Sequence, residues 1–169
     1  TDVSKNSFLM VGKRINIDVN YSIDFSINTW RDNLLSTVSS YGKLQPPDLI
    51  DYFIFPKGFV TNMPQFAVGR PGWDNWMIYN ARKKGAAVID ATSCFTAIHQ
   101  NHDYSHIPCG NGKTYEGFEA NKNRSMMKIN QFLSIDDANW KFSDGCIEKK
   151  FILKRRFQMY WRTLTQPIH

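Results

Sequence analysis

A helical pattern that leads directly into apolar runs is the feature that most limits the fold of this chain. Residues 74–84 place apolar and polar side chains at helical spacing, and Gly85 closes the pattern. The run AAVID at 86–90 follows at once and is typical of a buried strand, and residues 94–99 (CFTAIH) are a candidate for another. A helix connected through a glycine to buried strands is typical of α/β proteins. We therefore expect an α/β domain.

The same kinds of pattern predict further elements along the chain. Short apolar runs and an alternation with a period of two predict strands at residues 7–11, 17–27 and 50–56. Helical spacing predicts helices at residues 30–41, 125–132 and 148–163, the first with Thr29 as its N-cap. We interpret residues 101–123, which are rich in Gly, Asn, His and Asp, as an ordered loop.

Positive charge is concentrated near the C-terminal end. The chain has 21 Lys and Arg against 15 Asp and Glu, a net charge of +6, and residues 148–156 carry much of the excess. We therefore divide the chain into an α/β part, residues 1–143, and a basic C-terminal helical segment, residues 144–169. Such a segment is a candidate for peripheral contact with a membrane surface. Nucleic acid is not expected as a partner.

The cysteines and the absence of long apolar runs bear on location. Cys94, Cys109 and Cys146 are an odd number at irregular spacings, which suits reduced thiols better than a disulfide framework. No run approaches the roughly 20 apolar residues of a membrane span, and no signal peptide is visible. We therefore expect a cytoplasmic protein.

Polar and aromatic residues crowd residues 68–106 and form two groups there. The first group follows a tight Gly-Pro loop and contains Arg70, Trp73, Asp74, Asn75 and Trp76. Asp74 falls in the first turn of the expected helix, where a carboxylate is favoured by the helix N-terminus. This group is either a ligand site or a purely structural helix start, in which Asp74 caps the helix and both tryptophans lie in the core.

The second group, residues 99–106, leaves the end of an expected strand, where ligands of α/β sheets commonly bind. It contains three histidines and one aspartate, and therefore both nitrogen and oxygen ligands for a divalent metal. The spacing matches no closed zinc site, so we expect at most one histidine to serve as a metal ligand beside a nucleotide. The alternative is that these are hydrogen-bonded loop histidines.

Three stretches of the chain resemble one known group of proteins. They resemble bacterial glycosyltransferase-like proteins of the nucleotide-diphospho-sugar transferase (GT-A) superfamily. The three stretches are residues 8–14 (FLMVGKR), 51–58 (DYFIFPKG) and 66–105. The similarity covers about residues 8–123. Its order of parts is similar to the later, acceptor-side half of a GT-A domain, as in polypeptide N-acetylgalactosaminyltransferases. The resemblance implies a partial GT-A-like mixed sheet flanked by helices.

The resemblance also implies an activity and roles for particular residues. The activity is transfer of a sugar from a nucleotide-sugar donor to a glycan or another hydroxyl acceptor. Asp74 takes the acceptor-side acidic position, whose carboxylate in inverting members is the general base that removes the proton of the acceptor hydroxyl. His99, or alternatively His102, takes the metal-ligand position for Mn²⁺ or Mg²⁺, which would neutralise the leaving diphosphate. The implied acceptor-binding or substrate-binding residues are Arg70, Trp73, Asn75, Trp76, Asn101 and Tyr104.

The chain departs from the superfamily in one respect. GT-A enzymes bind the nucleotide with an earlier βαβ half that ends in an Asp-x-Asp motif, and this sequence has none. We therefore expect the nucleotide-binding half to be absent from this chain, and an exposed sheet edge to favour a homo-oligomer. Two alternatives remain open here. One is a metal-dependent nuclease that uses the His-rich loop with Asn121 or Asn123. The other is a non-catalytic carbohydrate-binding module with Trp73, Trp76 and Tyr104 as stacking platforms.

Overall fold

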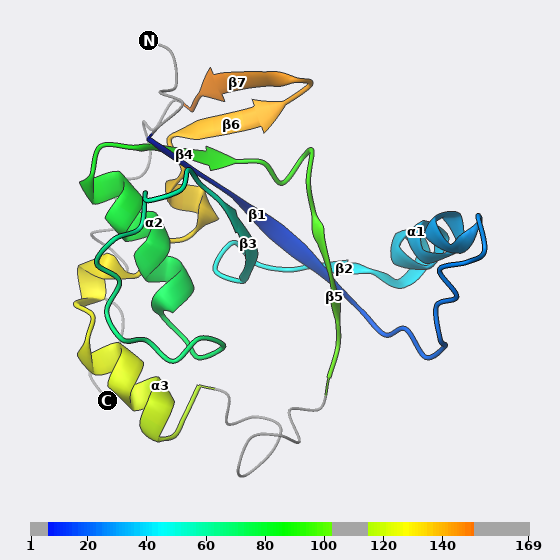
Figure 1. Ribbon diagram of the computed structural model, residues 1–169, viewed down its shortest axis with the longest axis horizontal. Coiled ribbons are helices and arrows are strands. Elements are labelled where there is room, and N and C mark those ends of the chain that lie inside the picture. The colour runs from blue at the N-terminus through cyan, green and yellow to red at the C-terminus, as the bar shows by residue number, and fades with distance from the viewer. Residues whose placement is uncertain (1–6, 103–114, 151–169) are drawn as a thin grey trace.

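A single long strand organises the molecule. The computed structural model describes residues 7–102 and 115–150, and its strands belong to one seven-stranded mixed sheet. Strand β1 (Phe8–Ile17) crosses the molecule (Figure 1) and pairs along both of its edges. Its first half pairs with β3 (Ile50–Ile54), which is antiparallel, and with β4 (Ala87–Asp90), which is parallel. Its second half pairs in the same way with β2 (Lys43–Leu44) and β5 (Ala97–Gln100).

The sheet continues beyond β4 into a hairpin. Strand β6 (Trp140–Ser143) is parallel to β4, and β7 (Cys146–Lys149) pairs antiparallel with β6. Asp144 lies in the hairpin turn with a φ of 53°, and Gly145 follows with a φ of 76°. The boundary placed at residue 144 therefore falls inside a hairpin. The helix expected from residue 148 is wrong for its first residues, which belong to β7; residues 151–169 lie outside the described residues.

Helix α2 (Trp73–Lys83) covers the first half of β1 and forms the core with it. Its buried residues are Trp76, Met77, Ile78 and Ala81, and they belong to one cluster with Leu9, Val11 and Val88, all three of which are 0% exposed. Helix α3 (Phe118–Ser125) and the short 3-10 helices at Ile129–Gln131 and Ile135–Asp137 complete this side of the molecule. The expected loop at 101–123 thus ends in a helix, and the helix expected at 125–132 starts and ends earlier.

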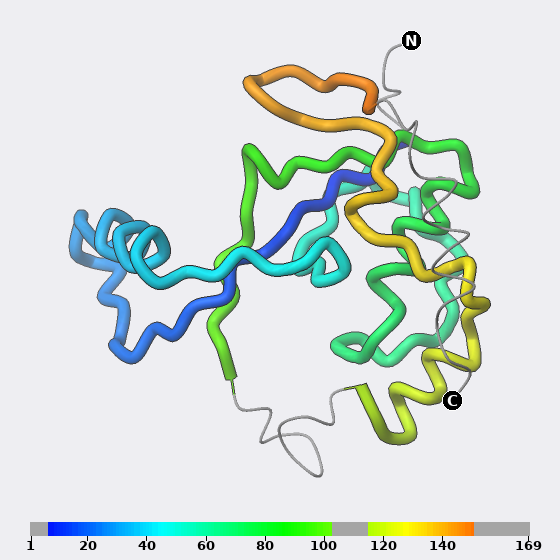
Figure 2. Tube along the Cα trace, turned by 180° about the vertical axis from the view of Figure 1, so that it is seen from behind, coloured from blue at the N-terminus to red at the C-terminus, as the bar shows by residue number. Residues whose placement is uncertain are grey.

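Residues 18–29 and helix α1 (Trp30–Tyr41) form an arm that projects from the main body (Figures 1 and 2). No residue of α1 is buried, and Thr29 makes no side-chain cap hydrogen bond. An open groove of about 440 Å³ lies between the arm and β5, with mostly apolar lining residues such as Ile23, Phe25 and Leu34.

The strand expected at 17–27 is wrong beyond Ile17, where β1 ends. Asp24 makes a local turn instead, because its carboxylate accepts hydrogen bonds from both the amide and the hydroxyl of Ser26. Several of the apolar residues that alternate in this segment line the groove, among them Val19, Ile23 and Phe25.

A β-bulge in β3 turns two neighbouring side chains toward β5. The register between β1 and β3 shifts between Val11 and Lys13, so that Asp51 and Tyr52 together lie opposite Gly12. Tyr52 crosses over Gly12 and donates a hydrogen bond to the carbonyl of Phe95, 2.6 Å away. A Cβ at position 12 would overlap the Tyr52 hydroxyl, so only glycine fits there.

The structure contains the expected strands at residues 7–11, 50–56 and 86–90 and the expected helices at 30–41 and 74–84. The α/β class is thereby confirmed. No helix within the described ranges is long and apolar enough to cross a bilayer. Cys94 and Cys146 are free thiols, and Cys109 lies outside the described residues.

Candidate functional site

The start of α2 holds Asp74 in a half-buried position. Gly72 takes a φ of 103° as the residue before the helix, and no side chain caps this end. Asp74 is the second residue of α2, and its carboxylate accepts the amide of Asn75 at 2.9 Å. Burial raises the pKa of Asp74 from 3.8 to about 6, while the amides of Asn75, Asp74 and Gly72 act in the opposite direction. Asp74 is thus a carboxyl group poised near neutral pH.

A buried asparagine fixes the loop before α2. Asn123 of α3 is 0% exposed, accepts the amide of Ala67 at 2.9 Å, and donates to the carbonyls of Ala67 and Pro71 at 3.0 and 3.2 Å. Its side-chain amide is therefore fully used by backbone groups. This role excludes Asn123 as a ligand of a nuclease metal.

The two tryptophans of the motif pack inward. Trp76 is 8% exposed, belongs to the core and contacts Phe66 with ring centroids 5.7 Å apart. Trp73 is half-buried and contacts Phe53 of β3 at 5.1 Å. Trp76 is therefore a core residue with little exposed ring surface, and the packing interpretation of this residue accounts for its position.

The polar neighbours of Asp74 are also engaged within the protein. Asn75 donates its side-chain amide to the carbonyl of Leu133 at 2.8 Å, which ties α2 to the segment after α3. Arg70 donates its Nε to Glu119 at 2.8 Å, and its side chain is 18% exposed. Both residues therefore stabilise the loop and helix around Asp74, and acceptor binding by either residue stays a prediction.

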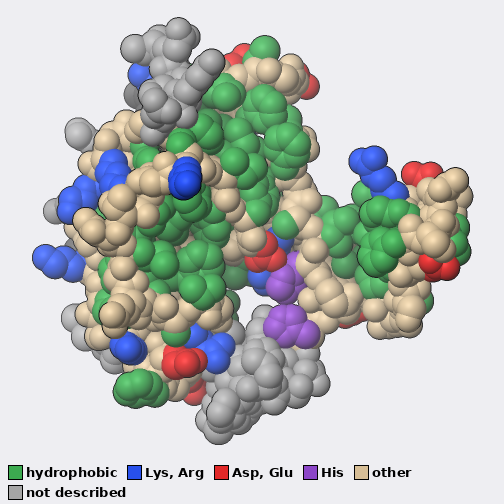
Figure 3. Space-filling view, viewed as in Figure 1, with side chains coloured by type: hydrophobic (Ala, Val, Ile, Leu, Met, Phe, Trp, Pro, Cys, Tyr) green, Lys and Arg blue, Asp and Glu red, His purple; other side chains and the backbone are tan. Residues whose placement is uncertain are grey.

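A second polar cluster lies where β1, β3 and β5 meet. Arg14 Nη1 donates to Asp51 Oδ1 at 2.7 Å, and His99 Nδ1 lies 2.6 Å from Asp51 Oδ2. His99 is the cross-strand partner of Asn16, and the bulge in β3 brings Asp51 to the same place. The two described histidines (purple in Figure 3) lie between the main body and the arm, with acidic and basic side chains next to them. We call Arg14, Asn16, Asp51 and His99 the histidine cluster.

Two buried atoms of the histidine cluster lack a protein partner. They are Nε of Arg14, a donor, and Oδ1 of Asn16, an acceptor, and they are the two such side-chain atoms among the residues that the structure describes. Buried polar groups in native proteins are nearly always hydrogen-bonded to protein, water or a ligand. The histidine cluster is therefore suited to a polar ligand.

The histidines fit part of a metal site. The rings of His99 and His102 have centroids 5.5 Å apart, and Nδ1 of His99 faces Asp51, which leaves Nε2 of His99 on the other side of the ring. Imidazole nitrogens are suitable ligands for Mn²⁺ and related ions. No group of three His, Cys, Asp or Glu within the described ranges is arranged to hold a metal ion. Within these ranges His99 and His102 therefore supply at most part of a metal's ligand set, and a metal here stays a prediction.

The other expected site residues are placed as follows. Asn101 follows β5 and donates its backbone amide to the carbonyl of Ile17 at 2.8 Å. Tyr104 lies outside the described residues. Strand β3 links the two groups that the sequence predicts, because Phe53 contacts Trp73 beside Asp74 and Asp51 contacts His99.

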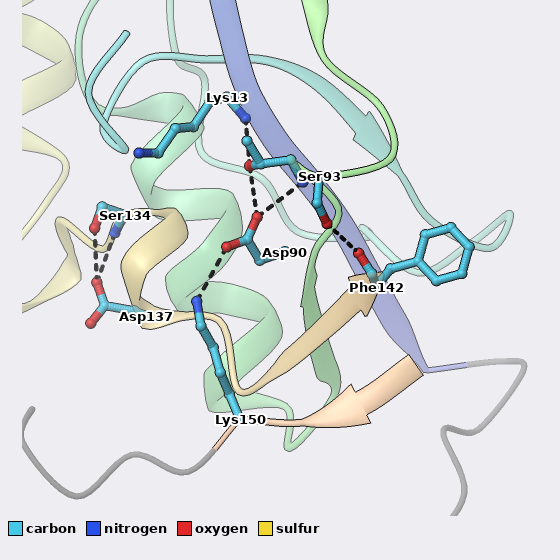
Figure 4. Close-up of polar contacts among 8 residues, drawn as sticks. Lys13, Asp90, Ser93, Ser134, Asp137, Phe142 and Lys150 are labelled. Atoms are coloured by element: carbon cyan, nitrogen blue, oxygen red, sulfur yellow. Dashed lines mark hydrogen bonds and ion pairs between the residues drawn. The ribbon is translucent and has the colours of Figure 1, made fainter. Parts of the chain in front are cut away.

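Asp90, at the carboxyl end of β4, is a third polar position. It accepts the amide and hydroxyl of Thr92 at 3.1 and 2.7 Å and pairs with Lys150 at 3.2 Å. Figure 4 shows Asp90 between Lys150 on one side and the turn that contains Ser93 on the other. Nearby, burial raises the pKa of Tyr52 to about 12, and Asp90 and Cys94 add to this effect. Tyr52 therefore remains a protonated hydrogen-bond donor.

Sequence reasoning missed Arg14, Asn16, Asp51 and Asp90 as polar members of the sheet. One signal was available for Asp51, which is a single charged residue inside the apolar run 50–56. A charge in such a position is rare unless it is paired.

No protein-family model, no curated protein and no solved structure matches this chain. A proposal for its function therefore depends on the motifs and on the geometry of the two polar groups.

Proposed function

We propose that this chain is the acceptor-side part of a GT-A-like glycosyltransferase, which transfers a sugar from a nucleotide-sugar donor to a hydroxyl acceptor. The observation that carries the proposal is Asp74, a half-buried carboxyl group at the start of α2 whose pKa is raised to about 6. The motif resemblance over residues 8–123 and the mixed sheet flanked by helices support it. The assignment of the sheet to the later half of a GT-A domain is part of the same proposal.

In the proposed reaction Asp74 acts as the general base. The acceptor hydroxyl gives its proton to a carboxylate oxygen of Asp74 while the acceptor oxygen forms a bond to the anomeric carbon of the donor sugar. The bond between the anomeric carbon and the diphosphate oxygen breaks, and the nucleoside diphosphate leaves with the electron pair. A pKa near 6 suits this task, because the group is ionised at neutral pH and still accepts a proton readily.

The histidine cluster would hold the leaving-group side of the reaction. His99, with His102 beside it, would bind Mn²⁺ or Mg²⁺, which supplies positive charge for the diphosphate. Arg14 places a second, permanent positive charge at the same cluster. The Nε of Arg14 can donate a hydrogen bond to a polar ligand there, and the Oδ1 of Asn16 can accept one.

Neither alternative function is favoured by an observation. Asn123 is fully hydrogen-bonded to the backbone, which removes one of the two asparagines considered for a nuclease. Trp76 is in the core, which removes one of the three stacking platforms of a carbohydrate-binding module.

The proposal is tested by thermal unfolding with UDP or GDP, each with and without Mn²⁺, on the wild type and on His99→Ala. Ligand at 100 times its dissociation constant stabilises a native protein by about 2.7 kcal/mol, which raises Tm by roughly 5–10 °C for a chain of this size. We expect a metal-dependent rise that is lost in His99→Ala and kept in Gln100→Ala, a control on the same strand. No rise at millimolar ligand would contradict the proposal for this chain.

A further inference from the structure

The hydrogen bond between Asp51 and His99 determines which ring nitrogen carries hydrogen. His99 Nδ1 lies 2.6 Å from Asp51 Oδ2, and the side chains of both residues are largely enclosed, at 20% and 23% exposure. A carboxylate oxygen accepts hydrogen bonds and a neutral imidazole donates from one nitrogen only. The hydrogen of a neutral His99 therefore lies on Nδ1, and Nε2 keeps its lone pair.

We infer that Asp51 is a positioning residue that holds His99 in the Nδ1–H tautomer and so leaves a bare Nε2 on the side of the ring away from Asp51. Histidines that bind metals commonly donate their other ring N–H to a carboxylate in this way. The use of Nε2 as a metal ligand depends on the proposed function. The tautomer itself follows from the contacts of Asp51 and can be measured without any metal.

Arg14 makes this arrangement specific. Its guanidinium donates to Asp51 Oδ1 at 2.7 Å, and its side chain is 13% exposed. A guanidinium has only donors, so whichever atom of residue 51 faces Arg14 must be an acceptor. The β-bulge opposite Gly12 fixes the backbone of residue 51 between the two partners. Residue 51 thus turns one oxygen to Arg14 and its other terminal atom to His99.

This geometry gives Asp51→Asn a definite outcome. The amide oxygen of the new side chain must face Arg14, so its NH₂ group faces Nδ1 of His99. An NH₂ group donates, so Nδ1 becomes the acceptor and the ring hydrogen moves to Nε2. Asp51→Asn therefore reverses the tautomer while it keeps the size and shape of the side chain.

The tautomer is measured by ¹H–¹⁵N NMR of histidine-labelled protein at about pH 8, with the signals of residue 99 assigned from their loss in His99→Gln. We expect Nδ1–H in the wild type and in the control Asp18→Asn, and Nε2–H in Asp51→Asn. A wild-type ring that carries its hydrogen on Nε2, or a tautomer that is unchanged in Asp51→Asn, would overturn the inference.

Mn²⁺ binding, measured by electron paramagnetic resonance with and without UDP, separates this inference from the proposed function. Loss of such an outer contact typically weakens metal binding by roughly 10- to 100-fold. We expect that loss in Asp51→Asn and unchanged binding in Asp18→Asn. Tautomers as expected without any Mn²⁺ binding to the wild type would support the positioning of His99 and refute the metal site of the proposed function.

Discussion

The substitution Asp74→Asn separates a functional carboxylate from a structural one. The pKa of Asp74 is raised by burial from 3.8 to about 6, so the folded protein holds a proton that the unfolded chain releases between these two values. The contribution of Asp74 therefore lowers the free energy of unfolding as the pH rises from about 4 to about 6. Above that range the contribution of Asp74 is constant. Asparagine cannot ionise, and its oxygen can still accept the amide of Asn75.

The size of the effect follows from the same shift. A pKa shift of about two units corresponds to roughly 3 kcal/mol between the charged and uncharged forms. We expect Asp74→Asn to raise the free energy of unfolding by about 2–3 kcal/mol at pH 7, and to leave it nearly unchanged below about pH 4. Urea denaturation at intervals from pH 4 to pH 8 measures both ends of this range.

Asp32 is the matched control, because it is an exposed carboxylate in the first turn of α1. Its replacement by Asn should cost about 0.3–1 kcal/mol at neutral pH, since it removes a favourable charge from a helix N-terminus. A loss of stability of that kind in Asp74→Asn at pH 7 would refute the reasoning. Asp74 would then be a structural residue, and its role as general base would lose its physical basis.

Two further predictions concern the residues that shape the sites. Asn123→Ala leaves buried backbone groups of residues 67 and 71 without partners, so we expect it to cost about 2–4 kcal/mol in chemical denaturation. An equal, small cost for Asn123→Ala and for Asn121→Ala, on the exposed side of α3, would contradict that role. Gly12→Ala places a methyl group against the Tyr52 hydroxyl and should cost about 1–3 kcal/mol. Part of this loss should be recovered in a double variant with Tyr52→Phe, and no recovery would mean that the contact is misidentified.

The elements with strong periodicity were predictable from sequence. Helix α2 and β4 follow from helical spacing, Gly85 and a short apolar run, and the structure has them within one or two residues of the expected bounds. The alternation at 17–27 was misleading, because a period of two describes an extended loop beside an apolar groove as well as a strand. Only part of β1 was predicted, since Lys13, Arg14 and Asn16 interrupt its apolar pattern.

The candidate site was predictable only where it is local in sequence. Asp74 lies at the start of a helix, as its neighbours in the chain indicate. The contact between Asp51 and His99 joins residues 48 positions apart, and it exists because β3 and β5 both pair with β1. No local pattern encodes such a contact. The same holds for Asn123, which appeared in the sequence as one polar residue of a loop and is buried against residues 67–71.

The position of β1 between parallel and antiparallel partners has a consequence for synthesis. Its antiparallel partners β2 and β3 lie within about 50 residues along the chain, but the parallel partners of Phe8 and Ile17 are Ala87 and Gln100, about 80 residues away. At roughly 5–20 residues per second, the ribosome needs about 4–16 s to make that stretch. During this interval one edge of β1 lacks its native partners, and such an unpaired edge is open to pairing with other chains.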